Sequence, residues 1–158
     1  MPSFKTTRRV AVPADVSYAV AADVSSYKDF LPLVERSLVR GKITEIAGIK
    51  TFSAEVAVGY AKLNLRETFY SRVVCDANKH TVTATSQEPP FKHMTAIWTI
   101  RDINGQSEVS ISIDYAMRSL FLQFAIAAAM DTAVNKIMNA FEARAKSVHN
   151  ASKTISSA

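Results

Sequence analysis

The chain has 158 residues, 48% of them hydrophobic and 21% charged, which fits one soluble globular domain with a substantial core. The single cysteine, Cys75, excludes an internal disulfide and fits a reducing compartment. The net charge of +5 suits plain solubility, or an anionic partner such as a membrane surface or RNA. No polybasic run and no basic stretch with interleaved aromatic residues of the RNA-binding type is present.

The N-terminal region predicts one strand and two short helices. Residues 4–12 alternate in polarity and stop at Pro13, which cannot continue a β-ladder. Residues 13–24 predict a helix that Asp15 or Ser17 could cap, with valines at helical spacing at positions 16, 20 and 24. Residues 25–31 predict a second helical turn, which ends there because the residue before Pro32 avoids helical backbone angles.

The middle of the chain predicts an antiparallel meander. Six runs rich in β-forming residues follow one another: 34–46, 51–60, 62–76, 80–86, 92–103 and 107–117. Adjacent prolines at 89 and 90 interrupt the series, and the dipeptide Asn104-Gly105 is a strong hairpin signal. In the last run polar residues alternate with apolar ones, which indicates one solvent-facing (wet) and one core-facing (dry) side of the sheet. The dry side carries Val109, Ile111, Ile113 and Tyr115.

The C-terminal region predicts one long helix, from about Ser119 to about Val148. At about 1.5 Å per residue it would be roughly 45 Å long, enough to cover the dry face of the whole sheet. Its expected apolar stripe is Leu120, Phe124, Ala127, Val134, Ile137, Met138, Phe141 and Ala145. Residues 149–158 are polar and serine-rich, so we expect a disordered tail after a single domain of residues 1–148.

The expected fold is therefore α+β. A meander of this length must curl because strands twist, so we expect a curved antiparallel sheet of about six or seven strands wrapped on the long helix. The segment Ser119–Met130 carries no charge, yet it is shorter than the roughly 20 apolar residues of a bilayer span. It is rich in alanine, which either leaves a gap for an apolar guest or permits close helix–sheet packing. Composition alone leaves both readings open.

The side chains expected around such a gap are aliphatic and aromatic, which favours a lipid, a quinone or another apolar guest. On the sheet they are Phe52, Val56, Leu65, Phe69, Trp98, Ile100, Ile113 and Tyr115, and on the helix Phe124, Ala128, Val134 and Met138. Glu67 has the parity of Leu65 and Phe69, so it is expected to point inward. A carboxylate there would hydrogen-bond a polar headgroup, pair with an arginine, or reach solvent at the strand end.

The sequence offers little catalytic chemistry. Its three histidines are scattered without metal-ligand spacing, and no P-loop, nucleophile elbow or dinucleotide fingerprint is present. Cys75 is typical of an apolar filler. Glu67 is the one inward acid–base candidate, with Tyr115 a weaker second. We therefore expect a binding module with no catalytic residue, no metal and no required cofactor.

The run from Tyr18 to Val39 resembles the N-terminal signature of the coenzyme Q-binding START-domain family, which also contains the bacterial ribosome association toxin. The matching positions are Tyr18, Asp23, Val24, Tyr27, Phe30, Leu31, Pro32, Ser37 and Val39. A second block of the family's pattern resembles this chain at Pro90, Phe91 and Trp98. The end of the family's long helix resembles residues 141–146. The likeness extends from about Ser3 to about Val148. Members of the superfamily are often labelled polyketide cyclase/dehydrase and lipid transport proteins.

This resemblance implies a helix-grip (START/Bet v 1-like) fold with a hydrophobic tunnel between sheet and C-terminal helix. It implies that ubiquinone or a related lipid is the bound ligand of a non-enzymatic carrier or chaperone that supports respiratory electron transfer or quinone biosynthesis. Members often carry an aromatic residue and a cysteine where this chain has Leu33 and Val34, which leaves the ligand's identity open. The alternatives are a toxin-like inhibitor of translation that contacts the ribosome, and a polyketide cyclase/dehydratase-like enzyme.

We expect the tunnel mouth at the turn 27–32 together with the loop 87–91. Phe30, Leu31 and Phe91 would then touch a membrane, with anionic headgroups met by Lys28, Arg36 and Lys92. The alternative is that Phe30 and Leu31 anchor the turn to the core. Because no signal peptide is recognisable, we expect a cytoplasmic protein, peripheral to the inner face of the membrane, with no DNA partner.

Overall fold

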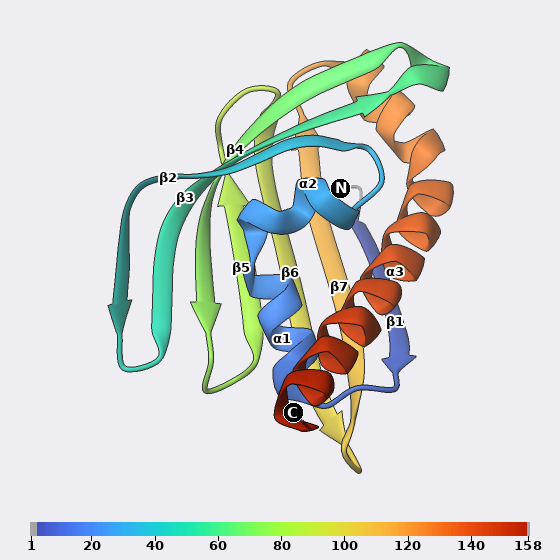
Figure 1. Cartoon of the computed structure of the whole chain (residues 1–158). Helices are drawn as coiled ribbons and strands as arrows, with labels where there is room; N and C mark the ends of the chain where they lie inside the picture. Colours follow the sequence, from blue (N-terminus) through green and yellow to red (C-terminus); the bar gives the residue numbers. More distant parts are fainter. Residues whose placement is uncertain (1–2, 158) are drawn as a thin grey trace.

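The computed structural model describes residues 3–157, apart from the side chains of residues 63, 131 and 153–157. Seven antiparallel strands form one curved sheet, in the order β1-β7-β6-β5-β4-β3-β2, whose concave face is covered by helices (Figure 1). The elements are β1 (Ser3–Val10), α1 (Ala14–Ala22), η1 (Val24–Ser26), α2 (Tyr27–Phe30), β2 (Val34–Ile46), β3 (Ile49–Tyr60), η2 (Ala61–Leu63), β4 (Leu65–Asp76), β5 (Thr81–Ser86), β6 (Phe91–Ile103), β7 (Gln106–Met117) and α3 (Leu120–Ser157). The predicted α+β helix-grip architecture is confirmed.

The sheet follows the alternation of the sequence. The predicted hairpin at Asn104-Gly105 joins β6 to β7, and both residues have positive φ angles (55° and 85°) as a tight two-residue turn requires. We call the end of the sheet where β3 ends and β4 begins the upper end, as it stands in Figure 1. There β4 has no neighbour on one side, because β5 pairs with it only between Arg72↔Thr85 and Asp76↔Thr81.

Helix α1 is anchored in the core by a polar contact at its base. Ser17 and Ser107 are both fully buried; the Ser17 hydroxyl donates to Ser107 Oγ (2.9 Å), and Ser107 Oγ donates to the carbonyl of Val12 (2.5 Å). The residue at the N-cap is Pro13, and its side chain makes no capping hydrogen bond. The expected cap at Asp15 or Ser17 is therefore wrong, because the helix begins earlier and buries Ser17 inside it.

Two groups of buried side chains fill the space between sheet and helices. The larger, which we call the main core cluster, joins β3–β7 to α1 and the second half of α3; in it the rings of Trp98 and Phe141 stack at 5.0 Å. The smaller, which we call the upper cluster, consists of Phe91, Tyr115 and Met117, against which Leu122 and other residues of the first part of α3 pack. The first part of α3 thus packs on the upper cluster, and its second half packs on the main core cluster.

Helix α3 departs from the prediction in two ways. It continues to Ser157, so residues 149–157, which we expected to be disordered, are helical; this stretch contains no glycine or proline to stop a helix already formed. It is also bent, with an angle of 55° between Leu120–Met130 and Thr132–Ser152, which we call the first and second arms. Within the described residues no single helix is long and apolar enough to cross a bilayer, and only the two bent arms together reach that length and composition.

Candidate functional site

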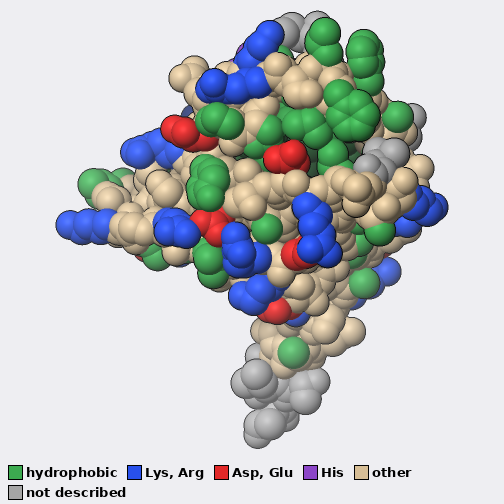
Figure 2. All heavy atoms as spheres, turned by 90° about the horizontal axis from the view of Figure 1, so that it is seen from above, with side chains coloured by type: hydrophobic (Ala, Val, Ile, Leu, Met, Phe, Trp, Pro, Cys, Tyr) green, Lys and Arg blue, Asp and Glu red, His purple; other side chains and the backbone are tan. Residues whose placement is uncertain are grey.

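An apolar cavity of about 170 Å³ lies between the upper end of the sheet and the bend of α3. The strands and the turn before β2 contribute Pro32, Leu33, Val34, Val58, Gly59, Tyr60, Leu65 and Phe69, and the helix contributes Ile126, Ala129, Met130, Ala133 and Ile137. Figure 2 looks onto this end of the molecule and shows hydrophobic side chains gathered over part of it. The small side chains of the helix therefore leave a gap here, as one of the two predicted readings required.

The sheet-side wall is shaped by an unusual backbone at the start of β2. Leu33 has a φ angle of 73°, a left-handed conformation that is rare for a residue with a side chain, and its carbonyl accepts a hydrogen bond from the Gly59 amide (2.9 Å). A Cβ at position 59 would meet the Glu35 carboxylate, which would have to move aside. This close approach sets Leu33 and Val34 against the cavity.

The helix-side wall consists of residues spaced three or four apart, so they share one face. Ala129 and Ala133 occupy the centre of that face, directly beside the bend. Further along α3, Ala145 is fully buried in the main core cluster, where its small side chain permits close packing. Both readings of the alanines thus hold, each for a different arm of the helix.

Only two of the predicted wall residues line the cavity, Leu65 and Phe69. Five others belong to the main core cluster: Phe52, Trp98, Ile100, Val134 and Met138. Of these, Phe52 also lines a separate pocket of about 420 Å³ between α1 and strands β2–β4. Val56 packs against that cluster, Ile113 against both clusters, and Tyr115 is buried in the upper cluster. The predicted tunnel between sheet and helix is therefore not open along the second arm of α3, where the rings of Trp98 and Phe141 stack.

The predicted helix face is wrong in the first arm. Phe124 and Ala128 point outward and are exposed, whereas Leu122, Ile126 and Met130 pack inward. The predicted stripe holds in the second arm, where Val134, Met138 and Phe141 are buried. A segment that is apolar on all sides carries no signal of which side faces the core.

Of the two segments predicted to form the mouth, only the turn 27–32 contributes to the cavity lining. Pro32 lines the cavity, but Leu31 beneath it is buried, and Phe30 is partly buried with the Arg144 guanidinium 5.3 Å from its ring centroid. These contacts favour the alternative in which Phe30 and Leu31 anchor the turn. Phe91 is only 6% exposed and packs on Phe69 (4.8 Å between ring centroids), so its expected exposure at a rim is wrong.

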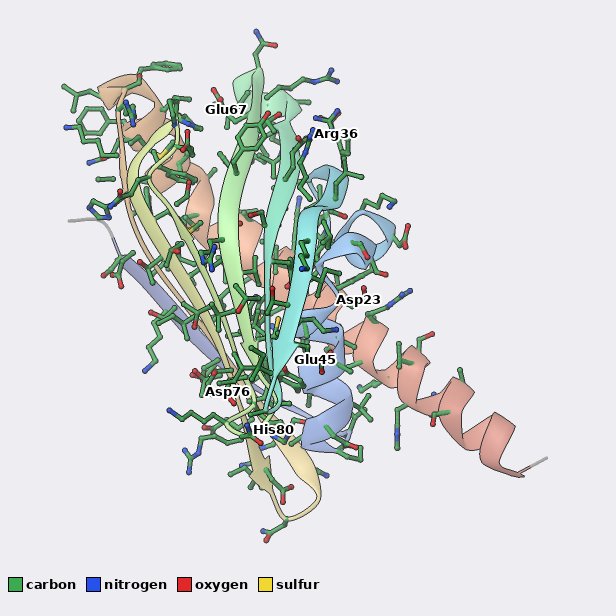
Figure 3. The ribbon with its side chains drawn as sticks, turned by 90° about the vertical axis from the view of Figure 1, so that its left-hand side faces the viewer. Asp23, Arg36, Glu45, Glu67, Asp76 and His80 are labelled. Carbon is green, nitrogen blue, oxygen red and sulfur yellow. The ribbon has the colours of Figure 1, made fainter. Side chains whose placement is uncertain are left out.

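The charged residues expected near the mouth have separate surroundings. Lys28 and Lys92 are exposed. Glu67 lies at the upper end of the sheet, as does Arg36 (Figure 3); it is half-buried and lines a surface groove with Pro89 and Pro90, outside the apolar cavity. The unpaired upper edge of β4 lets this carboxylate turn away from the cavity, so the expected inward position is wrong.

The deeply buried carboxylate is Glu55, which the sequence analysis did not single out. It lies on the outer face of the sheet and is 2% exposed, covered by Arg36 (2.7 Å) and Arg40 (2.6 Å). Desolvation raises the pKa of Glu55, but hydrogen bonds and charge from Arg40 and Arg36 outweigh it and hold the pKa below the ordinary value. Arg36 therefore fastens the edge strand β2 to β3.

The cavity lining contains almost no group that could act as an acid, base or nucleophile. Among its residues only Tyr60 carries a polar side-chain atom. Cys75 is buried in the main core cluster, where desolvation raises the pKa of its thiol to about 11 and keeps it protonated at neutral pH. Burial likewise raises the pKa of Tyr115 in the upper cluster. The site is built to hold an apolar group.

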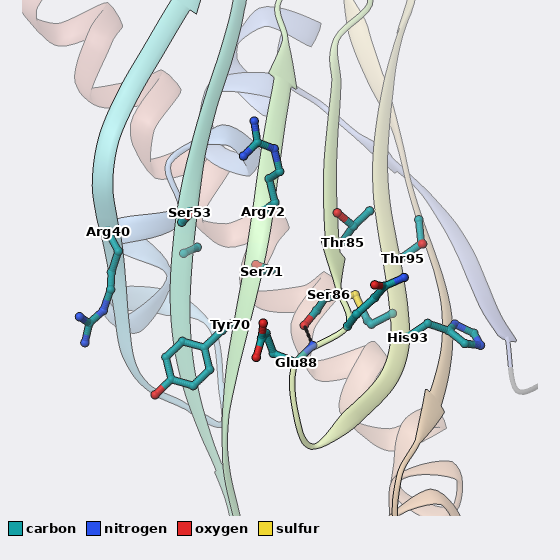
Figure 4. A pocket seen from close by; sticks show the side chains of 13 residues that line it. Arg40, Ser53, Tyr70, Ser71, Arg72, Thr85, Ser86, Glu88, His93 and Thr95 are labelled. Atoms are coloured by element: carbon teal, nitrogen blue, oxygen red, sulfur yellow. Dashed lines mark hydrogen bonds between the residues drawn. The ribbon is translucent and has the colours of Figure 1, made fainter.

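A second, wider hollow of about 790 Å³ opens on the outer face of the sheet, where β4 and β6 separate beyond the end of β5 (Figure 4). Its lining includes Arg40, Tyr70, Arg72 and Glu88, whose amide donates to Ser86 Oγ (3.2 Å). This lining is polar and open to solvent, so it does not suit an apolar guest.

Several lining residues were not predicted, although some carried a signal. Val58 has the parity of Phe52 and Val56, and Ala129 and Ala133 belong to the alanine-rich segment. Leu33 and Val34 follow the turn at Pro32 directly, but nothing in their local pattern shows that the chain turns back against Gly59 there. Tyr60 and Met130 gave no separate signal.

A curved sheet gripping a long helix, with an apolar cavity between them, is the START-like helix-grip fold. Residues 10–142 match the model of the family described as polyketide cyclase/dehydrase and lipid transport, and the chain belongs to that family. The predicted resemblance is confirmed.

Two relatives are similar to this chain over most of its length. The mitochondrial coenzyme Q-binding protein coq10 of Schizosaccharomyces pombe is 28% identical over 121 residues, which is 73% of this chain and 70% of that protein. The ribosome association toxin RatA of Escherichia coli is 24% identical over 152 residues, 96% of this chain and 91% of the toxin.

Two solved structures share the fold. An 18 kDa protein from Caulobacter crescentus is 27% identical with a TM-score of 0.80, covering 95% of this chain and 99% of that one. The ZhuI aromatase/cyclase from Streptomyces sp. R1128 is 20% identical with a TM-score of 0.77, covering 92% and 93%. The fold therefore includes enzymes as well as binding proteins, and the site must decide between them.

Proposed function

We propose that the protein binds ubiquinone or a closely related isoprenoid quinone in the cavity beneath the bend of α3, and that it carries this ligand without transforming it. The observation on which this proposal depends is the cavity itself: about 170 Å³, lined by apolar side chains from β2, β3, β4 and α3. A cavity of roughly 150 Å³ is enough to hold one benzene ring, so one isoprene unit or part of a substituted quinone ring fits.

The size of the cavity limits how such a ligand is held. A long isoprenoid tail exceeds the enclosed space, so the ring or the first isoprene unit occupies the cavity and the tail leaves past the rim at Leu33 and Tyr60. Phe69, whose ring packs at a tilt against Phe91, supplies an aromatic surface in the lining of the site. The name of the yeast relative, a coenzyme Q-binding protein, supports this class of ligand.

The lining also supports a carrier over a cyclase or dehydratase. General acid–base catalysis needs a titratable group within hydrogen-bond reach of the substrate, and Tyr60 is the one such group in the lining. Glu67, the acid that the sequence suggested, lines a separate surface groove.

Two experiments test the proposal. The first is extraction of the purified protein with organic solvent followed by mass spectrometry, and the second is titration with a water-soluble ubiquinone that carries one isoprene unit. We expect a quinone or related lipid in the extract and saturable binding at one site per chain. A lipid-free extract combined with no binding on titration would contradict the proposal.

A second candidate function is contact with the ribosome, favoured by the likeness to RatA over 96% of this chain and by the net charge of +5. Co-sedimentation with ribosomal subunits tests it. Binding through phosphate contacts would weaken steeply as salt rises, whereas no co-sedimentation at low salt would end this candidate.

A further inference from the structure

The outward face of the first arm of α3 is an exposed apolar surface. Leu120, Phe121 and Phe124 are each 71% exposed, and the alanines at 127 and 128 extend the same surface toward the bend. No described residue packs over these three large side chains. Single exposed apolar residues are common, but three within five positions form a patch that calls for a partner.

The opposite face of the same arm is equally apolar and closes the upper end of the molecule. Leu122, Ile126 and Met130 pack on the upper cluster, and Ile126 and Met130 also line the cavity. The first arm is fastened at its start by a hydrogen bond from the Met117 amide to the side-chain oxygen of Gln123 (3.0 Å). One helical segment of eleven residues thus separates the cavity from the surroundings, and both of its sides are apolar.

Exposed positive charges lie at the same end of the sheet. Lys62 follows β3, Lys92 lies at the start of β6 and Arg118 follows β7. The Arg118 guanidinium donates to the carbonyl oxygens of Phe91 (2.8 Å) and Gln87 (2.9 Å), which holds this charge two residues before Leu120. The acids at this end are Glu67, Glu88 and Glu35, of which Glu35 pairs with Arg66. Among the described residues named here, three cations (Lys62, Lys92 and Arg118) and two acids (Glu67 and Glu88) have no ion-pair partner.

We propose that the outward face of Leu120–Met130 docks on a lipid bilayer, with Phe121 and Phe124 inserted among the acyl chains and the nearby cations at the headgroups. Hydrocarbon is the partner that matches an uncharged helix face next to basic side chains. The cavity argues for the same partner, because Ile126, Ala129 and Met130 of that arm line it, so a bilayer bound to the arm would lie beside the cavity that the ligand leaves. Only this last argument, from the cavity and its ligand, rests on the proposed function.

Flotation of the full chain with phosphatidylcholine vesicles, with and without phosphatidylglycerol, tests the proposal. We expect the wild type to float with the vesicles, more strongly when phosphatidylglycerol is present. The double variant Phe121→Gln/Phe124→Gln keeps good helix formers at both positions and should lose about tenfold or more of the vesicle binding. The matched control is Ile43→Gln/Ile46→Gln, which removes two exposed isoleucines from the β2–β3 hairpin at the other end and should leave binding unchanged.

Two further measurements separate this proposal from its alternatives. Titration with the soluble ubiquinone in vesicle-free buffer should be the same for wild type and Phe121→Gln/Phe124→Gln, which shows that the variant is folded with its cavity intact. If neither protein binds quinone but the variant alone loses vesicle binding, the proposed function fails and the docking surface stands. Vesicle binding that is absent in the wild type, or equal in the two proteins, would overturn the proposal. A wild-type dimer in sedimentation that becomes a monomer in the variant, without vesicle binding, would assign the patch to a second copy of the chain and overturn it too.

Discussion

Filling the cavity at Ala133 should abolish ligand binding and leave the fold intact. Ala133→Leu adds three carbons to a helix face that already opens on about 170 Å³ of empty apolar space. At about 0.8 kcal/mol per buried methylene, the added carbons contribute up to about 2.4 kcal/mol, against about 1–3 kcal/mol of packing strain. The free energy of unfolding should therefore change by less than about 2 kcal/mol.

The effect on binding should be much larger. A ligand excluded from the cavity loses the burial of about one isoprene unit of five carbons, roughly 4 kcal/mol, which weakens binding on the order of a thousandfold. Titration with the soluble ubiquinone measures this loss, and urea unfolding measures stability. Ala128→Leu is the matched control, since it makes the same change on the exposed side of the same helix and should bind as the wild type does. A folded Ala133→Leu protein that binds quinone with wild-type affinity would refute the assignment of the cavity as the site.

Three predictions concern the framework. Glu55→Gln should lower the free energy of unfolding at neutral pH. Because the folded-state pKa of Glu55 lies below 4.5, the wild-type advantage should be present above pH 4.5 and vanish as the pH falls through that lower pKa. Urea unfolding measured across pH tests this, and a difference that stays constant with pH would contradict the ion-pair account. Phe141→Ala should cost about 3–5 kcal/mol and shift the emission of Trp98, the one tryptophan, to longer wavelength; unchanged emission would argue against the stack. Ser107→Ala should cost about 1–3 kcal/mol in thermal unfolding, because it leaves two buried partners without a hydrogen bond, and a neutral effect would speak against that network.

The fold could be predicted from the sequence because its signals are local and repeated. Alternation marks each strand, Asn104-Gly105 marks a hairpin and Pro13 and Pro32 mark element boundaries. Side-chain parity also placed Leu65 and Phe69 correctly on the wall of the cavity. These features depend only on residues close together in the chain.

The extent of the cavity could not be predicted, because it depends on how two distant surfaces meet. Trp98 and Met138 have the composition of pocket walls, but they lie where the second arm of α3 touches the sheet and are closed into the core. The first arm of α3 is apolar on all sides, so the sequence does not show that Phe124 lies outside and Ile126 inside. Neither proline nor glycine marks the bend of α3 in the sequence.

The most direct test of the central claim is an isotope-filtered NMR experiment that records contacts between a bound soluble ubiquinone and the methyl groups of the protein. The account predicts nuclear Overhauser effects from the quinone to the methyls of Val58, Ile126 and Ala133, which surround the cavity from both sides. Contacts confined to residues beside Tyr70 and Arg72 in the outer hollow, or none at all under saturating ligand, would contradict it.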